Sequence, residues 1–214
     1  VANNLTDHSN DTSSIKGLSE SEILDPNKIV VTVSNQNVPL VVLFGPPASG
    51  KTMTLIRLTR YLQSEGYIIS PIRTFRPTSD KNYDQICNNF DTMINSSNAA
   101  ANTDRVSFML VDVLNKNGRS LCQILEAPGE HYFDPKKPNN DFPAYVHTII
   151  NGANRKIWTI LVEPKWKDVS DRRNYVTKIT KLKSQMRSYD NVVFVYNKID
   201  TTPYVRSIGN INYT

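Results

Sequence analysis

The sequence has 214 residues, of which 39% are hydrophobic and 21% are charged, and it carries a net charge of +5. These values fit a soluble globular protein rather than a disordered or membrane one, and they predict one domain with its own core. No apolar run reaches the roughly 18 residues that cross a bilayer, and no secretory signal pattern is visible. We therefore expect a cytoplasmic protein without an integral membrane segment. The positive charge is too diffuse to indicate nucleic acid binding.

The first part of the chain is polar. Residues 1–27 are rich in Asn, Ser, Asp and Thr, which predicts a flexible N-terminal segment with a short helical turn near Glu20 to Leu24. Residues 28–214 are predicted to form the folded domain. It begins with two β-rich runs, "KIVVTV" and "PLVVLF", which predict a hairpin or two neighbouring strands.

Alternating helical and strand patterns follow. Apolar residues at helical spacing predict a helix over 51–63, which Gly66 ends, and further helices over 83–94, 144–152 and 171–189. The predicted strands lie in "YIISPIRTF", "RVSFMLVDVL", "RSLCQILEA", "IWTILVE" and "NVVFVY". Asn117-Gly118 joins two of them and predicts an antiparallel hairpin. The alternation predicts an α/β fold with a mostly parallel sheet and one antiparallel hairpin.

A glycine loop connects the second strand to the first long helix. It reads Gly45-x-x-x-x-Gly50-Lys51-Thr52, and this strand-loop-helix context makes it a strong phosphate-binding signal. Backbone N–H groups at the helix start would face the β-phosphate, Lys51 would neutralise β/γ oxygens, and Thr52 would ligate Mg²⁺. The predicted phosphate-binding residues are Gly45, Ala48, Ser49, Gly50, Lys51, Thr52 and Met53.

Taken alone, the loop sequence "GPPASGKT" is typical of ATPases such as the AAA+ family. Those enzymes need four apolar residues followed by Asp-Glu, but the nearest candidate, "FMLVDV", has valine after Asp112. Two other strings, "LEAPGE" and "VYNKID", follow later strands. With them, the chain resembles the P-loop GTPases of the Ras-like and translation-factor (TRAFAC) class, of bacterial type and unassigned subfamily. The resemblance covers about 39–200 and implies a three-layer P-loop NTPase fold.

The resemblance implies a guanine-binding motif at residues 197–200, "NKID". Asp200 would accept hydrogen bonds from N1–H and the 2-amino group of guanine, a donor pair that adenine lacks. Asn197 would brace the loop, and the aliphatic stem of Lys198 would lie along the base.

The resemblance also implies a second phosphate motif at residues 126–129. Gly129 would donate its N–H to the γ-phosphate, and the loop would order around the triphosphate. Glu126 replaces the family's Asp and would reach a Mg²⁺-bound water, with Asp112 as the alternative for another hairpin register. Thr103 is the predicted switch threonine and metal ligand, while Thr92 and Thr78 compete for that role.

The water-orienting position after the switch glycine carries Glu130, followed by His131. Neither residue matches the family patterns, so Glu130, His131 and Lys51 are the candidate catalytic residues of a slow GTPase. We expect Mg²⁺ as cofactor, GTP as substrate, GDP as product, and a protein effector or activating partner. An ATP-using ATPase or kinase is one alternative, and a nucleotide-binding scaffold with little hydrolysis is another. The family's closing strand and helix are predicted to be missing after Asp200.

Overall fold

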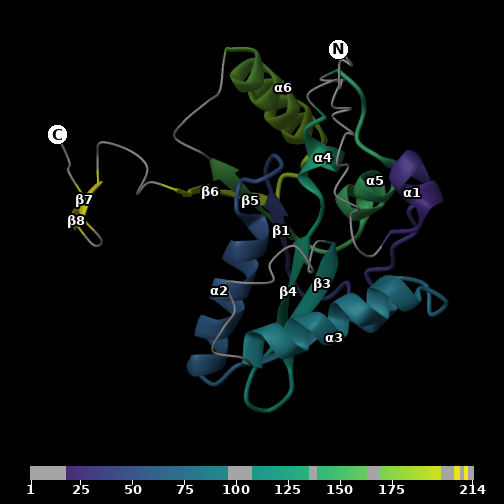
Figure 1. The fold of residues 1–214 in the computed structure, drawn as a ribbon, viewed down its shortest axis with the longest axis vertical. Helices are drawn as coiled ribbons and strands as arrows, with labels where there is room; N and C mark the ends of the chain where they lie inside the picture. Colours follow the sequence, from purple (N-terminus) through teal and green to yellow (C-terminus); the bar gives the residue numbers. More distant parts are fainter. Residues whose placement is uncertain are drawn as a thin grey trace, which may run out of the picture.

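Six strands form one sheet in the order β2-β3-β4-β1-β5-β6 (Figure 1). This computed structural model describes residues 18–95, 108–134, 139–162, 169–198, 205–207 and 210–211. The strands of the sheet are β1 (Leu40–Phe44), β2 (Ile68–Pro71), β3 (Met109–Leu114), β4 (Ser120–Glu126), β5 (Lys156–Val162) and β6 (Asn191–Tyr196). The sheet and its helices confirm the predicted α/β class, and they are compatible with a three-layer arrangement.

Strand β3 runs against the other strands of this sheet. It pairs antiparallel with β2 on one side and with β4 on the other. Strand β1 pairs parallel with β4 and β5, and β5 pairs parallel with β6. The predicted hairpin is β3–β4, and its turn places Gly118 at φ 75°, where glycine is favoured.

Five of the described helices occur in the chain order that the sequence predicts, and one, α4, was not predicted. They are α1 (Glu20–Leu24), α2 (Lys51–Ser64), α3 (Lys81–Asn95), α4 (Gly129–Tyr132), α5 (Ala144–Asn151) and α6 (Val169–Gln185), with 3₁₀ turns at Pro26–Lys28 and Arg73–Phe75. Helix α4 falls in a segment predicted as a loop, because four residues are too short to produce a helical period. Strands β7 (Val205–Ser207) and β8 (Asn210–Ile211) pair with each other in a separate sheet.

Strand β1, which lies between β4 and β5, is buried at four of its five positions. Phe44, the last residue of β1, is buried, and its ring centroid lies 4.6 Å from that of Tyr132 and 6.0 Å from that of Trp158. Aromatic pairs at such distances stabilise a core beyond the area that they bury. The strand therefore holds a fixed position up to the residue where the glycine loop begins.

The predicted strand over 28–33 is absent. Its residues are extended, and Ile29 and Val31 are buried while Val30 is exposed. However, the Thr32 N–H donates to the carbonyl of Phe75, which lies in a 3₁₀ turn and not in a strand. Leu18, in the segment predicted to be flexible, is buried, and α1 confirms the short helical turn predicted near Glu20 to Leu24.

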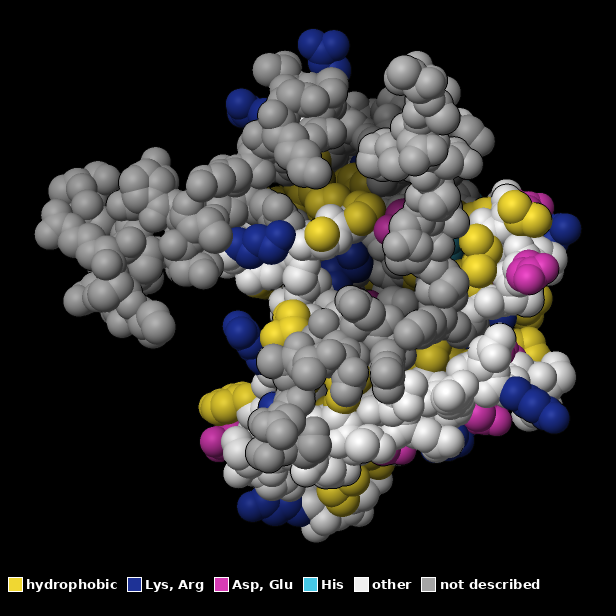
Figure 2. All heavy atoms as spheres, viewed as in Figure 1, with side chains coloured by type: hydrophobic (Ala, Val, Ile, Leu, Met, Phe, Trp, Pro, Cys, Tyr) yellow, Lys and Arg dark blue, Asp and Glu magenta, His cyan; other side chains and the backbone are white. Residues whose placement is uncertain are grey.

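The surface carries both signs of charge. Figure 2 shows Lys and Arg side chains of the described residues scattered over the visible face rather than gathered into one patch. Among the described helices, none has the length and apolar character that crossing a membrane requires.

Candidate functional site

The glycine loop occupies residues 45–50, between the end of β1 and the start of α2. Ala48 has φ 60° and Gly50 has φ 86°, so two left-handed residues flank Ser49. Such alternation turns successive backbone N–H groups toward a common centre, which makes a concave binding site for anions. Left-handed backbone costs alanine roughly 1–2 kcal/mol, so the surrounding contacts must hold Ala48 there.

Lys51 lies inside this loop. Its side chain is buried, and its Nζ donates hydrogen bonds to the carbonyl oxygens of Gly45 at 3.1 Å and Pro46 at 3.0 Å. A cation held by the loop's own carbonyls lies next to the N–H groups at the start of α2. Together they form a site that favours negative charge.

Thr52 and Glu126 meet beside the loop. The Thr52 hydroxyl donates a hydrogen bond to Glu126 Oε1, and Glu126 is only 2% exposed. Burial raises the pKa of Glu126 to about 7, although the Thr52 hydrogen bond and the Lys51 charge oppose the rise. Glu126 Oε2 is buried without a hydrogen-bond partner among the described residues.

This donor pair fits Mg²⁺, because the metal prefers hydroxyl and carboxylate oxygens and keeps several waters and phosphate oxygens as its other ligands. The unpartnered Glu126 oxygen is available to a metal-bound water. The described residues contain no cluster of three or more His, Cys, Asp or Glu side chains that could hold a metal by themselves. Thr103, the predicted switch ligand, lies outside the described residues.

Asp112, the alternative to Glu126 as the metal-binding carboxylate, lies further from the end of the β3–β4 hairpin that reaches the glycine loop. In the β3–β4 register it pairs with Gln123, whereas Glu126 pairs with Met109 at the end of the hairpin that reaches the glycine loop. Asp112 Oδ1 accepts a hydrogen bond from the Ser120 hydroxyl at 2.5 Å. The register therefore leaves Glu126 as the carboxylate beside Thr52.

Gly129 lies directly against the glycine loop. A Cβ atom added there would come within 2.3 Å of the Pro47 nitrogen and 2.4 Å of the Pro46 carbonyl carbon. Both contacts are with backbone, which cannot move aside as a flexible side chain can. Residue 129 thus packs on the glycine loop at a distance that only glycine allows.

Asn197 and Lys198 reach the same loop from the end of β6. Asn197 Nδ2 donates to the Ser49 carbonyl at 2.7 Å, and Lys198 Nζ donates to the Ala48 carbonyl at 2.7 Å. A Cβ on Gly50 would lie 2.2 Å from Asn197 Nδ2. Three segments that are far apart in sequence therefore converge on one loop. Asp200, the predicted base-reading residue, lies outside the described residues.

The side chains of Glu130 and His131 differ in their exposure to solvent. Glu130 is exposed, whereas His131 is 8% exposed and its Nδ1 shares a 2.8 Å hydrogen bond with the Tyr145 hydroxyl. Burial, and secondarily the Lys51 charge, lower the pKa of His131 to about 4. The imidazole is therefore neutral near pH 7, and the predicted role of orienting a water suits it better than Glu130.

Tyr132 was not singled out from the sequence, because it lies in the segment predicted as a loop. It is 1% exposed, and its hydroxyl has no hydrogen-bond partner among the described residues. Burial and the nearby Glu126 carboxylate both raise its pKa, so the phenol stays protonated. The one feature of the sequence that could have drawn attention to Tyr132 is that an aromatic residue stands three positions after Gly129.

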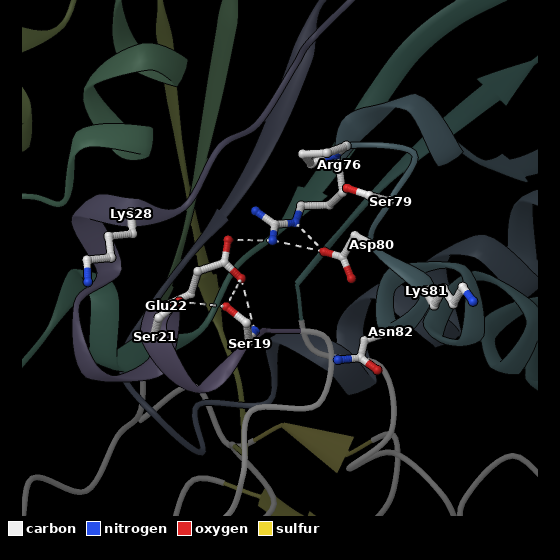
Figure 3. A pocket seen from close by; sticks show the side chains of 10 residues that line it. Ser19, Ser21, Glu22, Lys28, Arg76, Ser79, Asp80, Lys81 and Asn82 are labelled. Atoms are coloured by element: carbon white, nitrogen blue, oxygen red, sulfur yellow. Dashed lines mark hydrogen bonds and ion pairs between the residues drawn. The ribbon is translucent and has the colours of Figure 1, made fainter.

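A second polar hollow lies away from the glycine loop, between α1 and the start of α3. Figure 3 shows Arg76 between Glu22 and Asp80, with nitrogen–oxygen distances of 2.6 Å and 2.9 Å. Its remaining nitrogen donates to the Val30 carbonyl at 2.7 Å. These contacts occupy the guanidinium and tie the N-terminal segment to the sheet domain, which gives this hollow a structural role.

Comparisons of this chain with protein-family models, with curated proteins and with solved structures gave no match.

Proposed function

We propose that this protein binds Mg²⁺·GTP, hydrolyses it to GDP and phosphate, and changes the conformation of its phosphate-contacting loops between the two states. The observation that carries the proposal is the hydrogen bonding of Asn197 and Lys198 to the carbonyls of Ser49 and Ala48. These bonds connect the "NKID" segment to the phosphate-binding loop, where a nucleotide would touch both.

Selection of the base follows from this placement. Asp200 is two residues beyond Lys198 in the sequence, and the proposal gives its carboxylate the role of reading the base. The carboxylate can accept two hydrogen bonds from guanine, whereas adenine would leave it unpaired. An unpaired polar group in such a site rejects the wrong ligand strongly.

The phosphate end uses residues that the structure brings together. The loop N–H groups and Lys51 would hold the phosphates, Gly129 would contact the γ-phosphate, and Thr52 with Glu126 would hold Mg²⁺ and its water. When bound, Mg²⁺ supplies charge neutralisation for the transferred phosphoryl group. These residues need only position their ligands, because phosphoryl transfer depends mainly on positioning and electrostatics.

Turnover is proposed to be slow without a partner. Glu130 is exposed, and a carboxylate beside the γ-phosphate would be repelled. His131 is held by Tyr145 and is neutral, so it can orient a water but carries no charge to stabilise the transition state. An activating protein that supplies an arginine would provide that charge.

The decisive experiment is Asp200→Asn, tested by competition binding of GTP, ATP and xanthosine triphosphate. We expect the wild-type protein to prefer GTP over ATP. The variant should lose GTP affinity and gain affinity for xanthosine triphosphate, whose 2-oxo group needs a donor. A wild-type preference for ATP would favour an ATPase or kinase, and unchanged GTP affinity in the variant would refute the guanine assignment.

A nucleotide-binding scaffold with little hydrolysis is the second candidate. It is favoured by the exposed Glu130 and by the hydrogen bond that holds His131 against Tyr145. A multiple-turnover phosphate-release assay separates the two. GTP binding without phosphate release, with and without candidate activating proteins, would favour the scaffold.

A further inference from the structure

The hydrogen bond between His131 and Tyr145 joins two buried rings from different helices. His131 lies in α4 and is 8% exposed, whereas Tyr145 lies in α5 and is 1% exposed. The His131 Nδ1 and the Tyr145 hydroxyl oxygen are 2.8 Å apart, and the ring centroids are 5.5 Å apart in an edge-to-face contact. The Tyr145 ring also packs on Phe108, with centroids 5.3 Å apart. Packing therefore fixes the hydroxyl beside one particular nitrogen of the imidazole.

The chemistry of the two groups decides which of them donates. A phenol has one hydrogen to donate, and in a neutral imidazole one nitrogen accepts while the other donates. Burial raises the pKa of Tyr145 well above its ordinary value, so the hydroxyl keeps its hydrogen. Among the described residues this hydroxyl bonds only to His131 Nδ1. If Nδ1 were the donor, the phenol hydrogen would be buried without an acceptor, which is costly.

We infer that Tyr145 is a positioning residue for His131, because its hydroxyl donates to Nδ1 and so places the imidazole hydrogen on Nε2. His131 then acts as a hydrogen-bond donor and not as a general base, since a neutral ring with hydrogen on Nε2 cannot accept a second proton at that atom. The inference rests on the proposed function, which gives His131 its place at the reacting end of the nucleotide.

Helix α4 connects this pair of rings to the glycine loop. The helix begins at Gly129, where an added Cβ would lie 2.3 Å from the Pro47 nitrogen, and His131 is two residues further along. The His131 N–H donates to the Pro128 carbonyl at 3.1 Å, which holds the residue in the same turn. Within the described part of the chain no hydrogen bond reaches Nε2. Its hydrogen can therefore bond to an oxygen of a bound nucleotide, where a preorganised donor stabilises developing negative charge.

Long-range proton–nitrogen NMR correlations of the full chain, recorded near neutral pH and assigned with His131→Asn, test the tautomer directly. We expect hydrogen on Nε2 and none on Nδ1. Hydrogen on Nδ1 would overturn the inference, whether or not the protein binds GTP. Wild-type protein that binds no GTP would instead refute the proposed function, while the tautomer would still be read from the spectrum.

Two substitutions of His131 separate a donor from a base. Glutamine places an amide N–H near the position of Nε2, whereas leucine has no donor, and neither can act as a base. We expect His131→Leu to lower the single-turnover rate of GTP hydrolysis about 100-fold, a typical effect of losing one preorganised donor. His131→Gln should retain most of the rate. Equal losses in the two variants would overturn the inference.

Tyr145→Phe removes the hydroxyl and keeps the ring. It should lower the single-turnover rate about 10-fold, the effect of one hydrogen bond, and leave GTP affinity unchanged. It should add nothing to the loss in His131→Leu, because Tyr145 acts through His131. Tyr83→Phe is the matched control, since Tyr83 is equally buried and its hydroxyl donates to the Ile72 carbonyl at 3.0 Å. Equal rates in Tyr145→Phe and the control would overturn the inference.

Discussion

The side-chain amide of Asn197 donates a 2.7 Å hydrogen bond to the carbonyl of Ser49, across 148 residues of sequence. The bond joins the end of β6 to the loop that follows β1, although these two strands are separated by β5 in the sheet. The conformation of the glycine loop, including the left-handed Ala48, therefore depends on a residue outside the loop.

We predict that Asn197→Ala weakens GTP binding by about 10-fold and lowers the free energy of unfolding by about 1–2 kcal/mol, because the Ser49 carbonyl loses its donor. Titration calorimetry and urea unfolding measure the two effects. Asn95→Ala is the control, because Asn95 makes a 2.7 Å bond to the Asp91 carbonyl at the exposed end of α3. Equal GTP affinity in the two variants would contradict the prediction.

We predict that Gly129→Ala abolishes tight GTP binding, because the added Cβ forces the second phosphate motif off the backbone of Pro46 and Pro47. Gly152→Ala is the control, since its Cβ would meet nothing closer than 3.4 Å and its φ is −58°. The free energy of unfolding of the control should stay within about 0.5 kcal/mol of the wild type. Nucleotide affinity in the Gly129 variant that equals that of the control would show that the two motifs do not need this contact.

We predict that Mg²⁺ strengthens GDP retention in the wild type and that EDTA removes this effect. Thr52→Val should retain GDP equally weakly in both conditions, because the hydroxyl next to Glu126 is lost. Thr59→Val, in the same helix, is the control for Thr52→Val, since the Thr59 hydroxyl donates to the helix carbonyls of Leu55 and Ile56 and not to Glu126. Stopped-flow release of a fluorescent GDP provides the measurement, and a Thr52 variant that still responds to Mg²⁺ would count against the metal assignment.

The lowered pKa of His131 predicts a specific pH dependence of stability. The folded-state value of about 4 lies below the ordinary 6.5, so folding favours the neutral ring. The resulting stabilisation is fully present above pH 6.5 and is lost as the pH falls toward 4. Relative to His131→Asn, the wild type should lose on the order of 3 kcal/mol over this window, since each pKa unit corresponds to about 1.36 kcal/mol.

Urea unfolding of both proteins at several pH values between 4 and 7.5 measures this difference. The raised pKa of Glu126 acts in the opposite direction, because its stabilisation is lost as the pH rises from 4.5 through about 7. Glu126 is present in both proteins, so its contribution cancels when the two curves are subtracted. A difference that stays constant from pH 7.5 to 4 would show that His131 does not titrate as its burial indicates.

Features with a local cause could be predicted from the sequence. The Asn117-Gly118 turn depends on the φ preferences of two adjacent residues, and the structure has its hairpin there. The helix after Gly50 shows a clear apolar period, and its start agrees with the predicted residue, Lys51. The resemblance to P-loop GTPases also implied which loops would meet, although no local signal gives the close approach of Gly129 to the backbone of Pro47.

Features that depend on distant packing could not be predicted. The alternating burial of Ile29 and Val31 shows an extended segment facing the core, and the same alternation would occur in a paired strand. The ion pair of the buried Arg76 with Glu22 joins residues 54 positions apart with no periodic signal between them. The partner of His131 likewise lies 14 residues away on α5 and becomes visible only after folding.

Strand β6, which ends one residue before Asn197, is also an edge of the sheet that the described residues form, with Val193 and Phe194 exposed. Edge strands fray more readily than central ones, so β6 is a natural site of local opening. Under the proposed function, a bound nucleotide would add to the cost of that opening, by about 2.7 kcal/mol at a ligand concentration of 100 Kd. Amide hydrogen exchange along β6 would then report how much nucleotide is bound at the glycine loop, which follows β1.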